Sequence, residues 1–338
     1  MKRPSYRIKK AAMGNSKIRY SDILQAAKRI EGEAFRTPLL QPEALTRLTG
    51  AHVFLKPENL QRTGSFKFRG AYNAIASLTP AEKQKGVVAS SSGNHAQGVA
   101  EAARQHEVAA TIVMPADAPK MKIERTRQSG AEIIYYDRAT EDRDVVVGKV
   151  LEKTGCVEVH PFNNVSVIAG QGTVGEEIAL DVKAKGKQID RVLVCTGGGG
   201  LTAGVALAVR HHFPDAKVHP VEPQGFDDYA RSLRSGKLER NAKTAGSICD
   251  AVIVVSPGPI GFAINQEHAA EGLIVTDEEA LNAVRFAWEE LKLVLEPGGA
   301  IALAALLQAG KQWQGETIAV VLSGGNVDGD LFARTITT

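Results

Sequence analysis

Short runs of β-branched and other apolar residues recur along the chain, separated by stretches in which apolar residues have helical spacing. Six runs predict β-strands, at 87–92, 110–115, 132–137, 191–196, 216–222 and 317–325. Apolar residues at intervals of three and four predict helices over 95–106 and 201–213. Thr276 and Glu279 have the spacing of a capping box, so a further helix is expected over 276–292. Strands that alternate with helices indicate an α/β fold with a mostly parallel sheet.

The chain has 338 residues, and chains of this length tend to divide into domains. The strands expected at 87, 110 and 132 have a compact spacing of their own. We therefore predict a small domain at 80–158, inserted in a larger domain formed by 1–79 and 159–338.

Composition narrows the class of protein. With 43% hydrophobic and 23% charged residues, the chain resembles an ordinary globular protein, and a net charge of +3 does not indicate nucleic-acid binding. No run of 18 apolar residues predicts a membrane span, and the basic first 18 residues lack the apolar segment of a secretory signal. Cys156, Cys195 and Cys249 lack metal-binding spacing, so we expect buried thiols in a reducing cytoplasm.

A run of four glycines, 197–200, follows the strand that ends at Cys195. A helix is expected to begin near Leu201. Such a run can present backbone N–H groups to an anion at the positive end of a helix, which favours a phosphate. A tight turn without a ligand is the alternative. A dinucleotide site would use Glu222 for a ribose, but Thr202 takes the place of the third glycine of that fingerprint.

Two further polar stretches follow expected strands. The stretch 90–98, SSSGNHAQG, combines hydroxyls, an amide and an imidazole at an expected helix N-terminus, which suits a carboxylate or another oxyanion. A Ser or Asn helix cap with His95 in solvent is the alternative. Ser323 follows the apolar strand 317–322, where it could hydrogen-bond a ring nitrogen or serve only as a turn former.

Lys67 lies between Phe66 and Phe68 in the stretch GSFKFRG. Apolar neighbours disfavour the ammonium form, so the pKa falls and a nucleophilic amine that can form a Schiff base becomes available. The alternative is a lysine that reaches solvent from an amphipathic helix. A Schiff-base lysine, a phosphate site, a partner for a ring nitrogen and a carboxylate-binding loop are together the parts that pyridoxal phosphate requires.

Five motifs, GSFKFRGA, SSSGNHAQGVA, GGGGLTAG, EPGGA and LSGGNVD, resemble in this order the fold-type II pyridoxal-phosphate enzymes, specifically the threonine/serine dehydratase and serine racemase group. The resemblance spans about residues 20–328 and implies a tryptophan synthase β-like fold, whose two domains each have a mostly parallel open sheet flanked by helices. It implies pyridoxal 5′-phosphate as the cofactor and a cytoplasmic homodimer. The implied activity is dehydration and deamination of L-threonine and L-serine to a 2-oxo acid and ammonia. Serine racemase, or a dehydratase of another 3-hydroxy amino acid such as 3-hydroxyaspartate, is the alternative.

The resemblance also implies roles for individual residues. Lys67 matches the lysine that carries the cofactor, and Ser92 would be a second acid/base on the opposite face. The residues expected to contact the cofactor are Phe66, Lys67, Asn94, Gly197, Gly198, Gly199, Gly200, Leu201, Glu296 and Ser323. Those expected to contact the substrate are Ser91, Ser92, His95 and Arg143.

The stretch VEPQGFDD resembles the divalent-cation site of this group. Its ligands would be Glu222, the backbone carbonyl of Phe226, and Asp228. Oxygen ligands of this kind suit Mg²⁺ or Ca²⁺. Acids that cap a loop after a strand are the alternative.

The chain departs from the group at 249–251, where CDA replaces a common ADG. Ala251 is therefore expected to narrow the pocket or shift the pyridine ring, which bears on substrate choice. Ten residues follow SGGNVD, so no regulatory domain is expected there. Three other classes fit less well: a nicotinamide oxidoreductase lacks its third glycine, a β-replacement enzyme matches SGGN and VEPQGFDD poorly, and an inactive binding protein would not retain Lys67.

Overall fold

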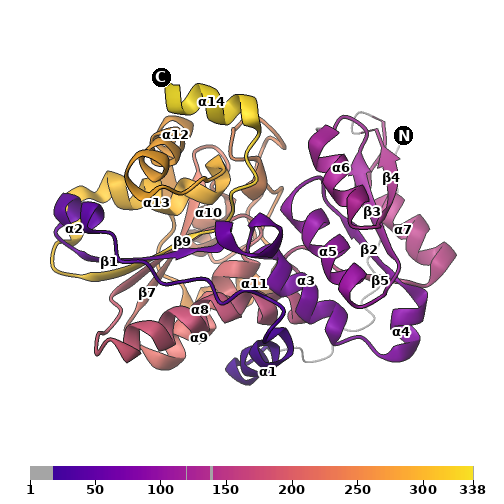
Figure 1. Cartoon of the computed structure of the whole chain (residues 1–338), viewed down its shortest axis with the longest axis horizontal. Helices are drawn as coiled ribbons and strands as arrows, with labels where there is room; N and C mark the ends of the chain where they lie inside the picture. Colours follow the sequence, from indigo (N-terminus) through magenta and orange to yellow (C-terminus); the bar gives the residue numbers. More distant parts are fainter. Residues whose placement is uncertain (1–17, 119, 138–139, 338) are drawn as a thin grey trace.

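The computed structural model describes residues 18–118, 120–137 and 140–337, which form two parallel sheets flanked by helices (Figure 1). The larger sheet has the order β1 (His52–Pro57), β9 (Thr317–Leu322), β6 (Arg191–Cys195), β7 (Lys217–Pro223) and β8 (Leu273–Val275). The smaller sheet has the order β4 (Glu132–Tyr136), β3 (Ala110–Pro115), β2 (Val87–Ser90) and β5 (Val157–Glu158). The expected α/β architecture is confirmed. The basic segment 1–17 lies outside the described residues.

Helices connect the strands of both sheets. The first seven are α1 (Tyr20–Ile30), α2 (Glu43–Thr49), α3 (Lys67–Ala76), α4 (Pro80–Lys85), α5 (Asn94–Gln105), α6 (Lys120–Gln128) and α7 (Arg143–Thr154). The others are α8 (Val165–Ala184), α9 (Gly200–His212), α10 (Asp228–Ser235), α11 (Pro259–His268), α12 (Asp277–Phe286), α13 (Pro297–Ala309) and α14 (Gly329–Thr337). The capping box before α12 is confirmed, because Thr276 Oγ1 accepts from the Glu279 N–H at 3.2 Å and Glu279 Oε2 accepts from the Thr276 N–H at 2.7 Å. The helix expected over 276–292 is α-helical only as far as Phe286, and a π-helical turn follows at Ala287–Leu291.

The two sheets lie in two lobes, with α4 to α7 around the smaller sheet (Figure 1). Helix α3 lies between them and packs against α5 of the smaller lobe and α8 of the larger one. Strand β9 is buried along its whole length, as expected for a central parallel strand that is covered on both faces. The proposed domain boundaries at 79/80 and 158/159 stay a prediction. In the described part of the chain, no helix is both long and apolar enough to span a bilayer.

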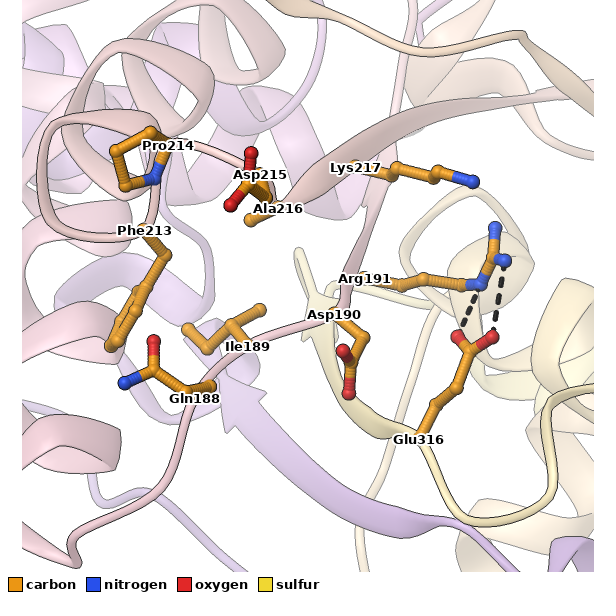
Figure 2. A pocket seen from close by; sticks show the side chains of 10 residues that line it. All are labelled: Gln188, Ile189, Asp190, Arg191, Phe213, Pro214, Asp215, Ala216, Lys217 and Glu316. Atoms are coloured by element: carbon orange, nitrogen blue, oxygen red, sulfur yellow. Dashed lines mark hydrogen bonds and ion pairs between the residues drawn. The ribbon is translucent and has the colours of Figure 1, made fainter.

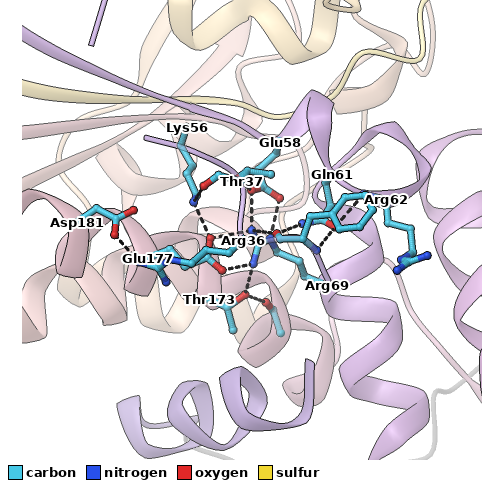
Figure 3. A network of polar contacts seen from close by, with 12 residues as sticks. Arg36, Thr37, Lys56, Glu58, Gln61, Arg62, Arg69, Thr173, Glu177 and Asp181 are labelled. Carbon is cyan, nitrogen blue, oxygen red and sulfur yellow. Dashed lines mark hydrogen bonds and ion pairs between the residues drawn. The ribbon is translucent and has the colours of Figure 1, made fainter. Parts of the chain in front are cut away.

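A buried ion network fixes one side of α3 (Figure 3). The Arg69 guanidinium donates to both carboxylate oxygens of Glu58, at 2.7 and 2.8 Å, and to both of Glu177, at 2.7 and 2.9 Å. Lys56 Nζ donates to Glu177 Oε2 at 2.6 Å. Residues two apart on a helix point about 200° apart. The network therefore holds the face of α3 that lies opposite Lys67.

Candidate active site

Lys67 is the first residue of α3 and is partly buried. Its Nζ donates to the Pro161 carbonyl at 3.0 Å and lies 5.0 Å from the centre of the Phe66 ring. Burial disfavours the ammonium form and lowers the pKa of Lys67 to about 8, although the nearby Glu296 carboxylate opposes part of this shift. A substantial fraction of the amine is therefore neutral at mildly alkaline pH.

The two phenylalanines beside Lys67 belong to different hydrophobic cores. Phe66 packs with Val174 and other residues of the larger lobe. Phe68 packs with Val87 and other residues of the smaller lobe. The amine therefore projects from the seam at which the two lobes meet, and apolar residues on both sides hold its backbone.

The glycine run 197–200 forms a turn without side chains between β6 and α9. A Cβ atom at Gly198 would lie 2.2 Å from the Phe162 ring, and one at Gly199 would lie 2.1 Å from the Tyr229 ring. Gly199 also has φ of 82°, which disfavours any residue with a side chain. Among the described residues, no carbonyl or side chain accepts a hydrogen bond from the N–H groups of residues 197–199. Unpaired N–H groups before a helix N-terminus fit a phosphate.

Asn94, Glu296 and Asn326 form a hydrogen-bonded chain. Asn94 Nδ2 donates to Glu296 Oε1 at 2.5 Å, and Asn94 Oδ1 accepts from Asn326 Nδ2 at 2.8 Å. Gly324 packs closely on this chain, because a Cβ there would lie 2.2 Å from Glu296 Oε1 and would displace that carboxylate. The fold thus brings Asn94 and Glu296 into direct contact, although 202 residues separate them.

Ser323 is buried next to the segment that carries Lys67. Its carbonyl accepts from the Phe66 N–H at 3.2 Å, and its own N–H donates to the Gly299 carbonyl at 3.2 Å. The Cys195 thiol donates to that same carbonyl at 3.4 Å, and its pKa is raised because it is buried. Phe66, Ser323 and Glu296 are therefore neighbours around the amine. Their expected contacts with a cofactor stay a prediction.

The loop before α5 holds the expected substrate residues. Ser91 Oγ accepts from the Gly93 N–H at 3.1 Å, and Ser92 is partly buried. His95 is buried rather than in solvent, and its Nε2 donates to the Val159 carbonyl at 2.6 Å. Burial and the nearby Lys67 amine lower the pKa of His95 to about 3, so the ring is neutral. Because Nε2 carries the proton, Nδ1 cannot donate to a carboxylate; His95 anchors the loop, and its contact with substrate stays a prediction.

Arg143 does not join this group of contacting side chains. It begins α7, its side chain is half exposed, and its Nε pairs with the carboxylate of its neighbour Asp144 at 3.2 Å. Its charge nevertheless contributes, after burial, to the lowered pKa of His160, which is about 4. Arg143 therefore lies on the smaller lobe within electrostatic range of the site, without a contact to Lys67.

The stretch expected to bind a cation holds two buried carboxylates. Both oxygens of Glu222 accept N–H groups at the start of α10, from Tyr229 at 2.9 Å and Ala230 at 2.7 Å. Asp228 Oδ2 is buried without a partner. Burial and the charge of Asp228 raise the pKa of Glu222 well above its usual range, and burial raises the pKa of Asp228 to about 6. No group of three or more His, Cys, Asp or Glu side chains in the described chain forms a metal cluster.

Sequence reasoning missed the segment that faces Lys67 from the other side. Strand β5 has only two residues, and the stretch HPFNN follows it at 160–164. This stretch supplies the Pro161 carbonyl that holds Lys67 and the Phe162 ring that packs on the glycine turn. The sequence feature that could have indicated this stretch is an aromatic and polar segment after a short apolar run. A search for β-strand periodicity does not detect such a segment.

A polar hollow lies at the end of the larger sheet where strands β6 and β7 begin (Figure 2). Its volume is about 380 Å³, and its lining includes Arg191 at the start of β6 and Lys217 at the start of β7. Arg191 pairs there with Glu316 at 2.5 and 3.2 Å. None of the expected site residues lines this hollow.

Comparison with known proteins agrees with this geometry. The model of the pyridoxal-phosphate dependent enzyme family matches residues 30–324, and the chain belongs to that family. It is 42% identical to an L-threo-3-hydroxyaspartate ammonia-lyase of Pseudomonas over 94% of this chain and 98% of that protein. It is 41% identical to an L-threonine ammonia-lyase of Thermotoga maritima over 94% of this chain and 78% of that protein. The serine racemase structure from Dictyostelium discoideum superposes with a TM-score of 0.86 at 37% identity, covering 93% of this chain and all of that one.

The family implies pyridoxal phosphate, and the residues present fit it. The glycine turn offers unpaired N–H groups for a phosphate, and Lys67 offers an amine that is easily deprotonated. Ser323 lies between the segment that carries Lys67 and the EPGGA segment, because it is hydrogen-bonded to both Phe66 and Gly299. The resemblance to fold-type II enzymes read from the five motifs is confirmed, and the chain is an enzyme of that type. The individual roles of the site residues stay predictions.

Proposed function

We propose that this enzyme is an ammonia-lyase that converts L-threonine and L-serine to the corresponding 2-oxo acid and ammonia. The observation that carries the proposal is the Lys67 amine, whose pKa of about 8 leaves a substantial fraction of it as a free base at mildly alkaline pH. Pyridoxal phosphate, when bound, withdraws electrons from Cα of an amino acid and so makes the Cα–H acidic. The neutral Lys67 Nζ would take that proton.

Residues of this chain favour elimination over slower chemistry. Ser323 would offer a ring nitrogen a neutral hydroxyl, which does not stabilise a protonated ring as a carboxylate would. By leaving the ring nitrogen of a bound cofactor unprotonated, Ser323 would favour prompt loss of the substrate β-hydroxyl. Lys67 is partly buried between the two lobes, which limits the access of water to the Cα proton.

The direct test is to incubate purified, cofactor-loaded enzyme with L-threonine, L-serine and L-threo-3-hydroxyaspartate, and to measure 2-oxo acid and ammonia. The last substrate belongs in the panel because a relative that is 42% identical is an L-threo-3-hydroxyaspartate ammonia-lyase. We expect 2-oxobutanoate from threonine and pyruvate from serine. If none of the three amino acids gives a 2-oxo acid, the proposal is wrong.

Serine racemase is the second candidate, because the solved serine racemase superposes over nearly the whole chain. Racemisation would require a second acid/base, and Ser92 in the loop before α5 is the proposed group. Chiral chromatography of the serine reaction distinguishes the two activities. Ser92→Ala should remove D-serine formation and leave pyruvate formation largely intact.

We also propose a divalent cation at Glu222, the carbonyl of Phe226 and Asp228. Two buried carboxylates with raised pKa values and an unpartnered oxygen at Asp228 support it, because a cation would compensate their charge. The homodimer implied by the family resemblance is likewise a proposal. Light scattering of the purified enzyme, with and without chelator, tests both assembly and its dependence on the cation.

A further inference from the structure

Arg125 reaches from the smaller lobe to the rim of the candidate site. It lies in the second turn of α6, and its Nη1 donates to Asn326 Oδ1 at 3.2 Å. Asn326 follows the SGG stretch of the larger lobe, and its Nδ2 donates to both Thr63 O and Asn94 Oδ1 at 2.8 Å. From these two hydrogen bonds and the size of an amide group, Arg125 Nη1 is at most about 8 Å from the Asn94 side chain.

Among the residues that the structure describes, none neutralises the charge of Arg125. Within the described ranges, no carboxylate is in ion-pair distance of its guanidinium, and its one side-chain partner is the neutral amide of Asn326. Other arginines of the smaller lobe are paired: Arg143 with Asp144 at 3.2 Å, and Arg127 with Glu124 at 4.0 Å. A hydrogen bond from a guanidinium to a carboxylate is roughly twice as strong as one to a neutral acceptor. An anionic group that reaches Arg125 would therefore displace the Asn326 amide oxygen.

We propose that Arg125 is a specificity-determining residue that binds a second carboxylate on the substrate side chain. This inference rests on the proposed ammonia-lyase function and assigns the site an acidic 3-hydroxy amino acid, such as 3-hydroxyaspartate, in addition to threonine. The amino and α-carboxyl groups occupy the same positions in both substrates. Of the two substrates, only the acidic one carries a second anionic group that the exposed guanidinium could bind. Its reaction would give oxaloacetate and ammonia, as threonine gives 2-oxobutanoate and ammonia.

The test compares Arg125→Met with Arg127→Met in the cofactor-loaded enzyme. Arg127 is a matched control on the same helix: it lies about 200° around from Arg125 and donates to the Tyr135 hydroxyl at 3.2 Å. For Arg125→Met we expect kcat/KM for L-threo-3-hydroxyaspartate to fall about tenfold or more, with less than about a twofold change for L-threonine. Arg125→Lys should retain part of the preference, and Arg127→Met should change neither substrate by more than about twofold.

Binding provides a readout that does not depend on turnover. Succinate and butyrate have four carbons each and differ in the second carboxylate, so we compare their affinities by the rise in melting temperature. Wild type and Arg127→Met should bind succinate more tightly than butyrate, and Arg125→Met should lose this preference.

Several outcomes overturn the proposal. Equal losses on both substrates in Arg125→Met would make Arg125 a tether between the lobes, and no loss on either would make it an ordinary surface residue. A wild type that deaminates threonine, but neither accepts hydroxyaspartate nor prefers succinate, refutes the role of Arg125 and leaves the proposed function standing. A wild type inactive on every substrate refutes the proposed function, and the succinate comparison then still decides whether Arg125 binds a second carboxylate.

Discussion

Replacing Arg69 with methionine tests the idea that the network in Figure 3 holds α3 in place. Methionine keeps an unbranched side chain but donates no hydrogen bond. Glu58 is fully buried and the Glu177 side chain is 12% exposed, so Lys56 would be left to balance the charge of two carboxylates. Breaking a buried ion pair by removing one partner typically costs about 3–5 kcal/mol, because a buried charge is left uncompensated.

The loss should be visible in thermal and urea unfolding at pH 8. For a chain of this length, about 3–5 kcal/mol corresponds to a melting temperature lower by roughly 4–7 °C if unfolding is cooperative. Arg36→Met is the matched control, because Arg36 pairs with Asp181 at the edge of the same network but has a side chain that is 54% exposed. The control should lose less than about 1 kcal/mol, the usual value of an exposed pair.

The pH dependence distinguishes charge from packing. Burial alone would raise the pKa of Glu177, but the ion pairs with Arg69 and Lys56 outweigh it and lower the pKa. A carboxylate with a lowered folded pKa contributes stability above its unfolded pKa, and loses this contribution as the pH falls through the folded value. In Arg69→Met the effect of burial on the pKa of Glu177 prevails and raises it. Protonation of Glu177 at lower pH then removes the uncompensated buried charge that destabilises the variant. The stability gap to wild type should therefore shrink between pH 8 and pH 5, and a gap below about 1 kcal/mol at pH 8, or one that widens at pH 5, refutes the reasoning.

Three further predictions concern the site. Lys67→Ala should abolish the absorbance of the covalently bound cofactor. In cofactor-free wild type, labelling of Lys67 by an amine reagent should rise with pH, with a midpoint near pH 8. A midpoint above about pH 10 would contradict the effect of burial on the Lys67 pKa. Gly199→Ala should weaken phosphate and cofactor binding at least about tenfold in fluorescence titration, because its Cβ would lie 2.1 Å from the Tyr229 ring; unchanged affinity would refute the close packing. Ca²⁺ should raise the melting temperature more at pH 7.5 than at pH 5, because the pKa of Asp228 is about 6 and only its deprotonated form binds a cation. If Asp228→Asn responds to Ca²⁺ as wild type does, the proposed cation site at Glu222 and Asp228 is excluded.

Much of the fold followed from apolar periodicity, because its signals are local. The six expected strands lie within about two residues of their observed positions, apart from the polar tails that were included after β2 and β9. Strands β5 and β8 were missed because they have two and three residues, too few to show a period. Strand β1 was missed because its apolar run, 53–55, has only three residues before Lys56 and Pro57, and only the fold reveals that Lys56 pairs with Glu177.

The candidate site was predictable where a single segment carries the chemistry. The glycine turn and Lys67 with its two phenylalanines could be recognised from short motifs. Contacts between distant segments could not: Asn326 joins Asn94 only through the tertiary fold, and the neutral state of His95 depends on burial that no local pattern encodes. Residue types in short motifs thus indicated candidate groups for the site. Tertiary packing determines the contacts between these groups and the protonation state of His95.

The anchoring of Phe66 and Phe68 in separate cores limits how this enzyme can be recombined with its relatives. A chimera that exchanges only residues 80–158 leaves behind the ring of Phe68, which the incoming lobe must accommodate. Phe66 must stay with the original scaffold. In such a chimera the sequence should therefore change from one parent to the other near Lys67, between Phe66 and Phe68. The loops at the predicted domain boundaries are less suitable crossover points.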